Sequence, residues 1–386
     1  FNFSYWRFIK FPPTFSNKET SLFIKNYNKI ISNFEKQIIA NPETFSFTGV
    51  NLHKPIMDYF GNGLLSELSN LLNCSIGYAK ILKIKKPTFA ISNHALGQNY
   101  AFGELCRHQN INAMLISHGT HTPQENKWAK LEWDFDSKSM INSHYPLVSI
   151  QTPWSEKFLD SKENLISKKV ITGPLLYAQN LRTDSENKLL RKNLYSDNHK
   201  KIILIHAATP FGWNYFRPWV NLTQDEYIMH INDLIKAVDM INGFFLVVKI
   251  RSKSFGGMSS SAIRRLFKNS SNYELFIDGS FEEYLITSDC LVSFSSTTIE
   301  EALQNKIPVL QYDPYNRYCH IPAMELYEEA SPTISPIYYT ATFTNLLFSL
   351  KWLRDKHLVK QKSNKLDWSD HILEPPSDWL QSIVKS

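Results

Sequence analysis

The chain has 386 residues, of which 43% are hydrophobic and 20% are charged, and its formal net charge is +6. This length exceeds one ordinary hydrophobic core, and the composition excludes a largely disordered chain. Lysine and arginine are scattered rather than clustered, which argues against nucleic acid as a partner. The four cysteines lack metal-binding spacing. We therefore expect a two-domain cytoplasmic protein with reduced thiols. Because the chain begins at Phe1, a preceding targeting segment or module remains an open alternative.

The first half begins with an amphipathic pattern at 22–39, which predicts a helix. From residue 86 onward, short apolar runs alternate with helical patterns. In the first half we expect strands at 87–91, 113–116, 147–150 and 170–174, and helices at 100–108 and from Pro153 onward. In the second half we expect strands at 201–205, 244–250, 273–277, 290–294 and 308–312, of which 308–312 is the last. The helices expected there lie at 224–240, 260–267, 281–286 and 298–304. This alternation predicts α/β architecture with two doubly wound, Rossmann-like parallel sheets.

The charged, asparagine-rich stretch at 176–199 is the expected domain boundary. It predicts an N-terminal domain over 1–178 and a second domain over 200–340. Residues 341–386 are expected to form helices that pack back on the first domain. The helix at 343–354 carries its apolar residues on one face, which favours a docked core face. The alternative is contact with a membrane surface through the cations and the aromatic ring of this helix, Lys351, Trp352, Arg354 and Lys356.

The strongest candidate site is the segment 293–302, Ser-Phe-Ser-Ser-Thr-Thr-Ile-Glu-Glu-Ala, where an apolar strand ends and a helix begins. Unpaired backbone N–H groups and a partial positive charge at a helix start suit a phosphate. Four consecutive hydroxyls add donors: Ser295, Ser296, Thr297 and Thr298. Glu301, one turn into the helix, could accept hydrogen bonds from ribose. The alternative is an ordinary helix cap, although four hydroxyls exceed what capping needs.

Two cations form a second candidate element. Lys249 and Arg251 stand two residues apart at the end of a strand and therefore share one face. A guanidinium can hold a phosphate through two parallel hydrogen bonds. The alternative is a basic strand end surrounded by water.

Histidines follow two strands of the first half. His118 lies in the loop Ser117-His118-Gly119-Thr120, and it could act as general base toward an acceptor hydroxyl. The loop Ser92-Asn93-His94 is of the same kind with a weaker case. A structural role is the alternative for both.

A long loop at 206–223 follows the first strand of the second half, and its length argues for function. Its aromatic residues suit sugar rings. Thr223 and Glu226 then form a capping box, which makes Asp225 a helix-start carboxylate by default and a catalytic carboxylate as the alternative. Four acidic residues of the first half compete with it: Glu125, Glu132, Asp134 and Asp136. The pair Asp134 and Asp136 is similar to a manganese-binding Asp-x-Asp motif but lacks its context, so we expect no metal.

The segment 290–303, Cys-Leu-Val-Ser-Phe-Ser-Ser-Thr-Thr-Ile-Glu-Glu-Ala-Leu, followed by Ile-Pro-Val-Leu-Gln-Tyr at 307–312, resembles the donor-nucleotide element of GT-B glycosyltransferases. It most resembles those that build bacterial surface polysaccharides, and the resemblance covers 200–320 well. It implies an acceptor-side domain over 1–178 and a nucleotide-sugar-binding domain over 200–340 that face a central cleft, with C-terminal helices crossing back. Ser295 to Thr298 would then face the donor phosphate. Many CMP-sugar transferases carry His-Pro where this chain has Arg251-Ser252, which weakens assignment to the sialyltransferase families.

Among those families the chain is similar to the β-Kdo transferases of lipopolysaccharide and capsule assembly. This similarity implies a metal-independent transfer of Kdo from CMP-Kdo to a glycan or glycolipid such as O-antigen, with retention through a carboxylate nucleophile, for which Asp225 is the candidate. It also implies no cofactor besides the CMP-linked donor, and work at the cytoplasmic face of the inner membrane. The alternatives are another CMP-nonulosonate or a UDP-sugar as donor, a UDP-sugar epimerase, and a non-catalytic glycan-assembly module.

Overall fold

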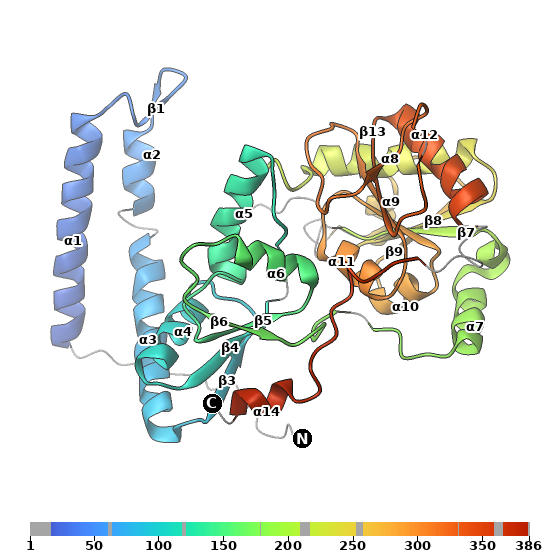
Figure 1. Cartoon of the computed structure of the whole chain (residues 1–386). Helices are drawn as coiled ribbons and strands as arrows, with labels where there is room; N and C mark the ends of the chain where they lie inside the picture. The colour runs from blue at the N-terminus through green and yellow to red at the C-terminus, as the bar shows by residue number, and fades with distance from the viewer. Residues whose placement is uncertain are drawn as a thin grey trace. The chain divides into compact units, whose positions relative to one another are not determined.

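A computed structural model describes residues 17–60, 64–117, 121–177, 179–208, 217–251, 258–330, 332–358 and 366–384 (Figure 1). The chain forms two compact units. The first contains residues 1–115 and 143–147, and the second contains residues 116–142 and 148–386.

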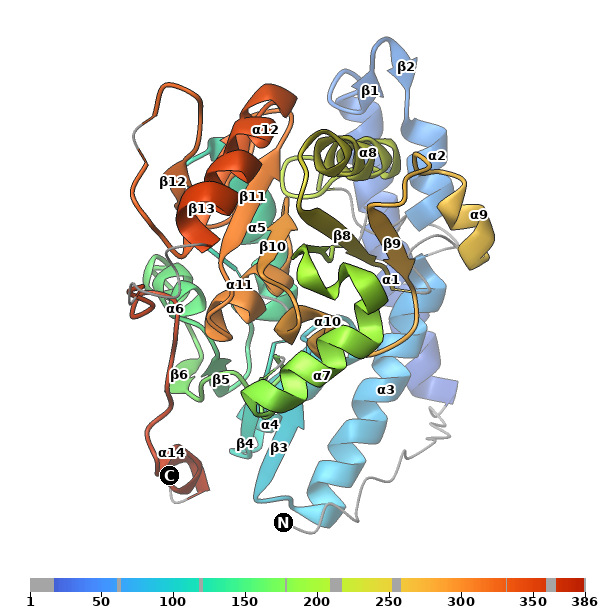
Figure 2. The same ribbon diagram turned by 90° about the vertical axis from the view of Figure 1, so that its right-hand side faces the viewer.

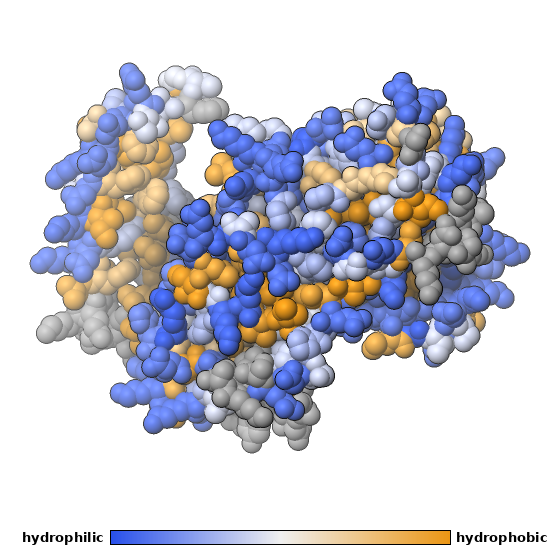
Figure 3. Space-filling view, viewed as in Figure 1, coloured by the Kyte–Doolittle hydropathy of each residue, from blue (hydrophilic) through white to orange (hydrophobic). Residues whose placement is uncertain are grey.

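The first unit begins with the helix that the sequence predicts at 22–39, observed as α1 (Asn17–Ala40). Figure 3 shows hydrophilic side chains along one edge of α1 and hydrophobic ones along the other, as an amphipathic helix requires. The elements that follow are the antiparallel hairpin β1 (Ser46–Phe47) and β2 (Val50–Asn51), then α2 (His53–Asp58), α3 (Leu64–Lys85), β3 (Phe89–Ser92), α4 (Gln98–His108) and β4 (Asn112–Leu115). Strands β3 and β4 pair in parallel.

The next elements along the chain are α5 (Lys127–Met140), β5 (Leu147–Ile150), α6 (Pro153–Asp160) and β6 (Lys168–Ile171). The smaller sheet has the strand order β3-β4-β5-β6. The helix start predicted at Pro153 is confirmed, because Thr152 and Ser155 form a capping box there and Pro153 occupies the first turn.

The larger sheet has seven strands in the order β12-β13-β11-β10-β7-β8-β9, and every adjacent pair is parallel. Its strands are β7 (Ile202–His206), β8 (Phe244–Lys249), β9 (Tyr273–Phe276), β10 (Cys290–Ser293), β11 (Val309–Asp313), β12 (Met324–Glu325) and β13 (Ile337–Ala341). The central strands β10 and β11 are buried along their whole length. Continuous apolar runs are what a parallel sheet covered on both faces demands.

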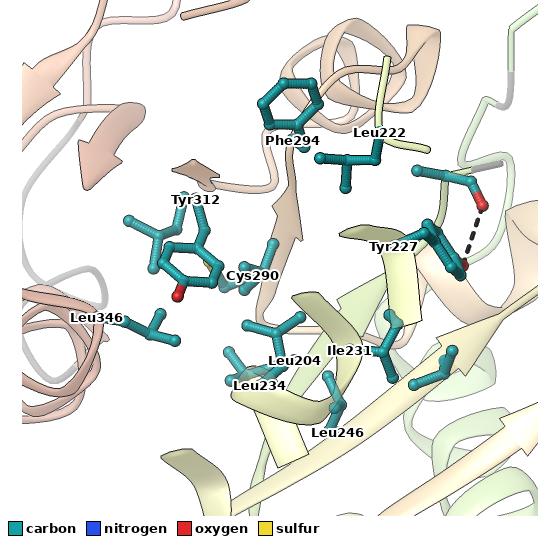
Figure 4. Close-up of a cluster of buried hydrophobic side chains, with 14 of the residues drawn as sticks. Leu204, Leu222, Tyr227, Ile231, Leu234, Leu246, Cys290, Phe294, Tyr312 and Leu346 are labelled. Carbon is teal, nitrogen blue, oxygen red and sulfur yellow. Dashed lines mark hydrogen bonds between the residues drawn. The ribbon is translucent and has the colours of Figure 1, made fainter. Parts of the chain in front are cut away.

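Helices cover both faces of this sheet (Figures 1 and 2). One face carries α8 (Gln224–Met240) and α12 (Phe343–Trp352), and the other carries α7 (Asp184–Tyr195), α10 (Phe281–Ile286) and α11 (Thr297–Gln304). A short helix, α9 (Ser260–Arg264), precedes β9. Under α8, the core joins helix residues such as Ile231 to strand residues such as Leu204 (Figure 4). The Tyr227 hydroxyl in this core donates to the Ala208 carbonyl, at 3.2 Å.

The sequence did not predict two features of this unit. The strand at 308–312 was expected to be the last, but β13 and β12 extend the sheet beyond it. β13 is short and follows a proline-rich stretch, and its place is set by pairing with β11 along its whole length. The stretch taken as a boundary, 176–199, contains α7, which begins with a capping box of Thr183 and Glu186.

The end of the chain is docked. α12 contacts α8 and β13, and it buries Leu346 and Leu350. Its apolar face is docked as the sequence predicts, but this helix packs on the second sheet and not on the first domain, where it was expected. Trp352 is partly buried against the same core. After the η3 turn (Leu353–His357), the described tail places His371 beside α6, where Trp154 Nε1 donates to His371 Nδ1 at 3.2 Å. The chain then reaches α14 (Trp379–Val384). Among the described helices, none combines the length and the apolar character that a membrane span requires.

Several histidines of the second unit are fully buried without a neutralising charge. Burial lowers the pKa of His206 and His357 to about 4, and that of His320 to about 3. The ordinary pKa of histidine is about 6.5 in an unfolded chain. The folded protein therefore binds fewer protons than the unfolded chain at acid pH. The stability that depends on these groups is complete above about pH 6.5 and is lost as the pH falls toward about 4.

We predict that His357→Gln makes stability less sensitive to acid. Glutamine can still hydrogen-bond to the Tyr338 hydroxyl, which lies 2.7 Å from His357 Nδ1, because its amide both donates and accepts. The free energy of unfolding is measured with denaturant between about pH 7.5 and 4.5. As the pH falls, it should decrease less steeply than in the natural protein, because about one proton fewer is taken up on unfolding. His199→Gln, at a partly exposed histidine, is the control. An unchanged slope in His357→Gln would contradict the prediction.

Candidate functional site

A cavity of about 220 Å³ opens at the carboxyl edge of the larger sheet. Most of its lining residues lie at or just beyond the ends of three adjacent strands, β10, β7 and β8, or in the first turns of α11, and one begins α10 after β9. They are Ala207, Ala208, Lys249, Ile250, Arg251, Phe281, Ser296, Thr297, Thr298 and Glu301. Six of these were predicted from sequence as donor-binding residues, and the structure brings those six together.

The topology of the sheet explains why the cavity lies here. From β7 the chain moves through β8 to β9 in one direction, and it then returns to β10 on the other side of β7. The strand order therefore reverses between β7 and β10. In open parallel sheets, the loops on the two sides of such a point diverge and leave a crevice for a ligand.

The start of α11 forms one wall of the cavity. Ser296 caps the helix, since its hydroxyl accepts from the Thr298 backbone N–H at 3.2 Å. The Thr298 hydroxyl donates to the Ala207 carbonyl at 2.6 Å and so ties α11 to the end of β7. Within the described part of the chain, no hydrogen bond holds the Thr297 hydroxyl. The capping alternative thus accounts for Ser296, a structural bond accounts for Thr298, and Thr297 remains available to a ligand.

The two cations differ in how they are held. The Lys249 ammonium donates to the Ile277 carbonyl at 2.8 Å and is partly buried, whereas Arg251 is exposed. Burial lowers the pKa of Lys249, while the charge of Asp278 raises it and that of Arg251 lowers it. Lys249 is therefore a fixed positive charge at the base of the wall, and Arg251 has the freedom to close on an anion.

Glu301 lies one turn into α11 and is partly buried. Burial raises the pKa of Glu301 to about 7, although the charge of Arg251 opposes this rise. The carboxyl group therefore changes its charge near neutral pH. When protonated, it can donate to an acceptor atom, and when ionised, it can accept from sugar hydroxyls.

Ser295 is not among the residues that line the cavity. It lies instead near Tyr318, a buried residue whose hydroxyl accepts from the Trp133 Nε1–H at 3.0 Å. The same hydroxyl lies 2.6 Å from His320 Nδ1. Ser295 thus lies beside a buried polar network at the start of α11.

Of the two residues predicted as catalytic, only Asp225 lies in the described part of the chain, and it is not among the residues that line the cavity. His118 falls outside the described residues, as do Gly119 and Thr120. Asp225 is exposed on the first turn of α8, and the capping box of Thr223 and Glu226 predicted beside it is confirmed. The catalytic role of Asp225 stays a prediction.

Three of the competing carboxylates have structural partners. Glu132 accepts from the backbone N–H groups of residues 219 and 220, at 3.0–3.1 Å. Asp134 pairs with Lys162, and Asp136 lies 2.8 Å from Arg217 Nη1. Glu125 is exposed. In the first unit, the loop after β3 folds on itself, with the Ser92 hydroxyl donating to the His94 carbonyl at 2.8 Å. No group of metal-ligating side chains is found among the residues that the structure describes.

Sequence reasoning missed the neutral part of the site. Ala207 and Ala208 offer backbone and a small surface directly after β7, and Phe281 contributes an aromatic ring at the start of α10. Small residues after a strand permit close approach of a ligand, which is a signal that the sequence contained. Phe281 carried no such signal, because its place depends on how α10 packs on the sheet.

No family model matches this chain, and no curated protein sequence does. Solved structures do resemble it. The UDP-GlcNAc 2-epimerase from Neisseria meningitidis bound to UDP-GlcNAc has a TM-score of 0.51 and 16% identity, and the match covers 82% of this chain and 80% of that one. A putative UDP-N-acetylglucosamine 2-epimerase from Listeria monocytogenes matches at a TM-score of 0.42 and 12% identity, over 64% of this chain and 61% of that one. The wall teichoic acid polymerase TagF matches at a TM-score of 0.41 and 14% identity, over 72% and 68%.

The first of these similarities shows the fold. The chain has the two-domain, Rossmann-like GT-B architecture that the sequence predicted. Function does not follow from this architecture alone, because one fold serves many reactions.

We predict that two adjacent isosteric substitutions have different effects on stability. Thr298→Val removes the bond to Ala207 and leaves that carbonyl unpaired, which should lower the free energy of unfolding by about 1–2 kcal/mol. Thr297→Val should change it by less than about 0.5 kcal/mol. Denaturant unfolding of both variants measures this difference, and equal losses would contradict the assigned hydrogen bond.

Proposed function

We propose that this protein is a nucleotide-sugar enzyme that binds the phosphates of its substrate in the cavity at the start of α11. The observation that carries the proposal is the convergence of Lys249, Arg251 and Thr297 on one cavity at the switch point of the sheet. Two cations, a free hydroxyl and a helix start all favour an anion. Glu301 at the same wall gives the cavity a partner for sugar hydroxyls.

The proposed reaction is glycosyl transfer. Departure of the nucleotide places growing negative charge on the phosphate. Arg251, Lys249 and the α11 dipole are placed to stabilise that charge without a metal ion. The finer assignment is transfer of Kdo from CMP-Kdo to a bacterial surface glycan, with His118 as the general base. It rests on the resemblance of residues 290–312 to donor-nucleotide elements.

The second candidate is epimerisation of a UDP-sugar. The similarity to the Neisseria meningitidis UDP-GlcNAc 2-epimerase over 82% of the chain favours it. An epimerase needs groups that remove and return a proton at the sugar ring. Among the described residues that line the cavity, Glu301 is the only acidic one. It is therefore the candidate for this proton transfer.

The nucleotide preference is tested by thermal unfolding with CMP, UDP, GDP and CDP. A nucleotide at about 100 times its dissociation constant should stabilise the fold by about 2.7 kcal/mol. Preference for CMP supports the Kdo assignment, and preference for UDP favours a UDP-sugar. Stabilisation by none of the four would overturn the proposal and leave a non-catalytic module.

Arg251→Gln should weaken binding of the preferred nucleotide about tenfold to a hundredfold, because a charge-assisted hydrogen bond to phosphate is lost. Calorimetric titration measures the change. Arg265→Gln, at an exposed arginine just after α9, is the matched control and should bind normally. Equal affinities of the two variants would remove Arg251 from the site.

Glu301 should make binding depend on pH. As the pH rises from about 6 to 8, its carboxyl loses a proton and adds negative charge beside the bound phosphate, so affinity should fall. In Glu301→Gln this dependence should be weaker than in the natural protein, since glutamine stays neutral. Titrations across this range compare the two proteins, and identical pH profiles would contradict the role of Glu301.

Transferase and epimerase are separated by the need for an acceptor. The protein is incubated with the sugar nucleotide of the preferred base, and the products are identified by NMR. An epimerase forms the second sugar-nucleotide epimer without any acceptor. A transferase leaves the sugar configuration of unreacted donor unchanged and releases nucleotide faster when an acceptor glycan is added.

A further inference from the structure

Helix α5 exposes three large apolar side chains. Trp128, Leu131 and Phe135 are exposed by 48%, 60% and 76%. Their spacing of three, four and seven residues places them in one row on the helix, here named the α5 stripe. Lys127 and Lys138 stand four residues before and seven residues after Leu131, so they continue the same row at its two ends.

The other side of α5 is held firmly in the second unit. Trp133 is buried, and its indole N–H donates to the Tyr318 hydroxyl at 3.0 Å. Glu132 accepts from the backbone N–H groups of Trp219 and Val220. Rotation of α5 to bury the stripe would break these bonds and expose the indole of Trp133. The exposure of the α5 stripe is therefore built into the packing of the helix.

The surroundings of the stripe are basic. Lys127, Lys130 and Lys138 are all exposed, and Lys127 Nζ lies 5.4 Å from the centroid of the Trp128 ring. Asp134 on the same helix is paired with Lys162. Within the described residues, no ion pair holds Lys127, Lys130 or Lys138. Apolar side chains rimmed by such lysines suit a surface that is apolar beneath and negatively charged above.

We propose that the α5 stripe docks this protein on a membrane surface that contains anionic lipid. Trp128 and Phe135 enter the boundary between headgroups and acyl chains, where tryptophan is favoured. Lys127 and Lys138 remain at the level of the lipid phosphates. The proposal does not depend on the reaction that the cavity supports.

A second copy of the chain is a poorer occupant. In a two-fold symmetric contact, the same patch faces itself. The lysines at the ends of one α5 stripe would then approach those of the other, and like charges brought together oppose association. A bilayer of anionic lipid presents the opposite charge at every point around the stripe.

The test is flotation of the full chain with vesicles. Binding to phosphatidylcholine vesicles with about 30% phosphatidylglycerol should exceed binding to pure phosphatidylcholine, and salt should weaken it because the lysine contribution is screened. Phe135→Ser should reduce the partition coefficient about tenfold, since one large apolar side chain no longer leaves water. Lys127→Glu with Lys138→Glu should remove the preference for anionic lipid.

Leu189→Ser is the matched control. Leu189 is 61% exposed on α7 and is flanked by lysines, but it is not part of an apolar row. Circular dichroism and thermal unfolding should show that all variants fold like the natural protein. Equal binding of Phe135→Ser and Leu189→Ser would overturn the proposal. Absence of vesicle binding by the natural protein would also overturn it. A third contrary outcome is a dimer, seen in sedimentation, that Phe135→Ser dissociates while the natural protein does not bind vesicles.

Discussion

The seven-stranded parallel sheet depends on one constraint: each of its strands must be covered on both faces. A parallel pair needs a crossover, and the crossovers bring helices to the two faces in turn. Here α8 and α12 cover one face, and α7, α10 and α11 cover the other. The change from one direction to the other, at β7 and β10, forces the loops above these strands apart. The cavity is a consequence of how this sheet is covered.

One hydrogen bond keeps that opening in a defined form. The Thr298 hydroxyl connects the first turn of α11 to the backbone after β7, at the point where the strand order reverses. It fixes the direction of the helix start and thereby the direction of its N–H groups. The neighbouring Thr297, with the same side chain, lines the cavity. Two identical residues thus differ in their environment, because the hydroxyl of Thr298 donates to a carbonyl and that of Thr297 has no hydrogen bond among the described residues.

The charged residues at the cavity also differ in how they are held. Lys249 is anchored to a backbone carbonyl, Arg251 is exposed, and Glu301 is partly buried with a pKa raised to about 7. An anchored cation, an exposed cation and a carboxyl with a raised pKa thus share one cavity, so the net charge of its wall depends on pH near neutrality. Away from it, the Trp133, Tyr318 and Glu132 contacts hold α5 so that an apolar row faces outward. The chain therefore presents one surface suited to a soluble anion and another suited to an apolar boundary.

The sequence by itself determined the alternation of strands and helices from residue 86 to 312, and with it the parallel α/β class. Apolar runs such as 244–249, and caps such as Thr152 and Thr223, act over a few residues, so these elements could be placed closely. It also predicted that Lys249, Arg251 and the hydroxyls at the start of α11 share a site, and all of these except Ser295 line one cavity. Tertiary structure alone decided which hydroxyl is bonded internally, because that depends on the position of Ala207, ninety-one residues away. It also decided that β13 joins the sheet and that Phe281 lines the cavity. These outcomes arise from contacts between distant segments, which no local pattern encodes.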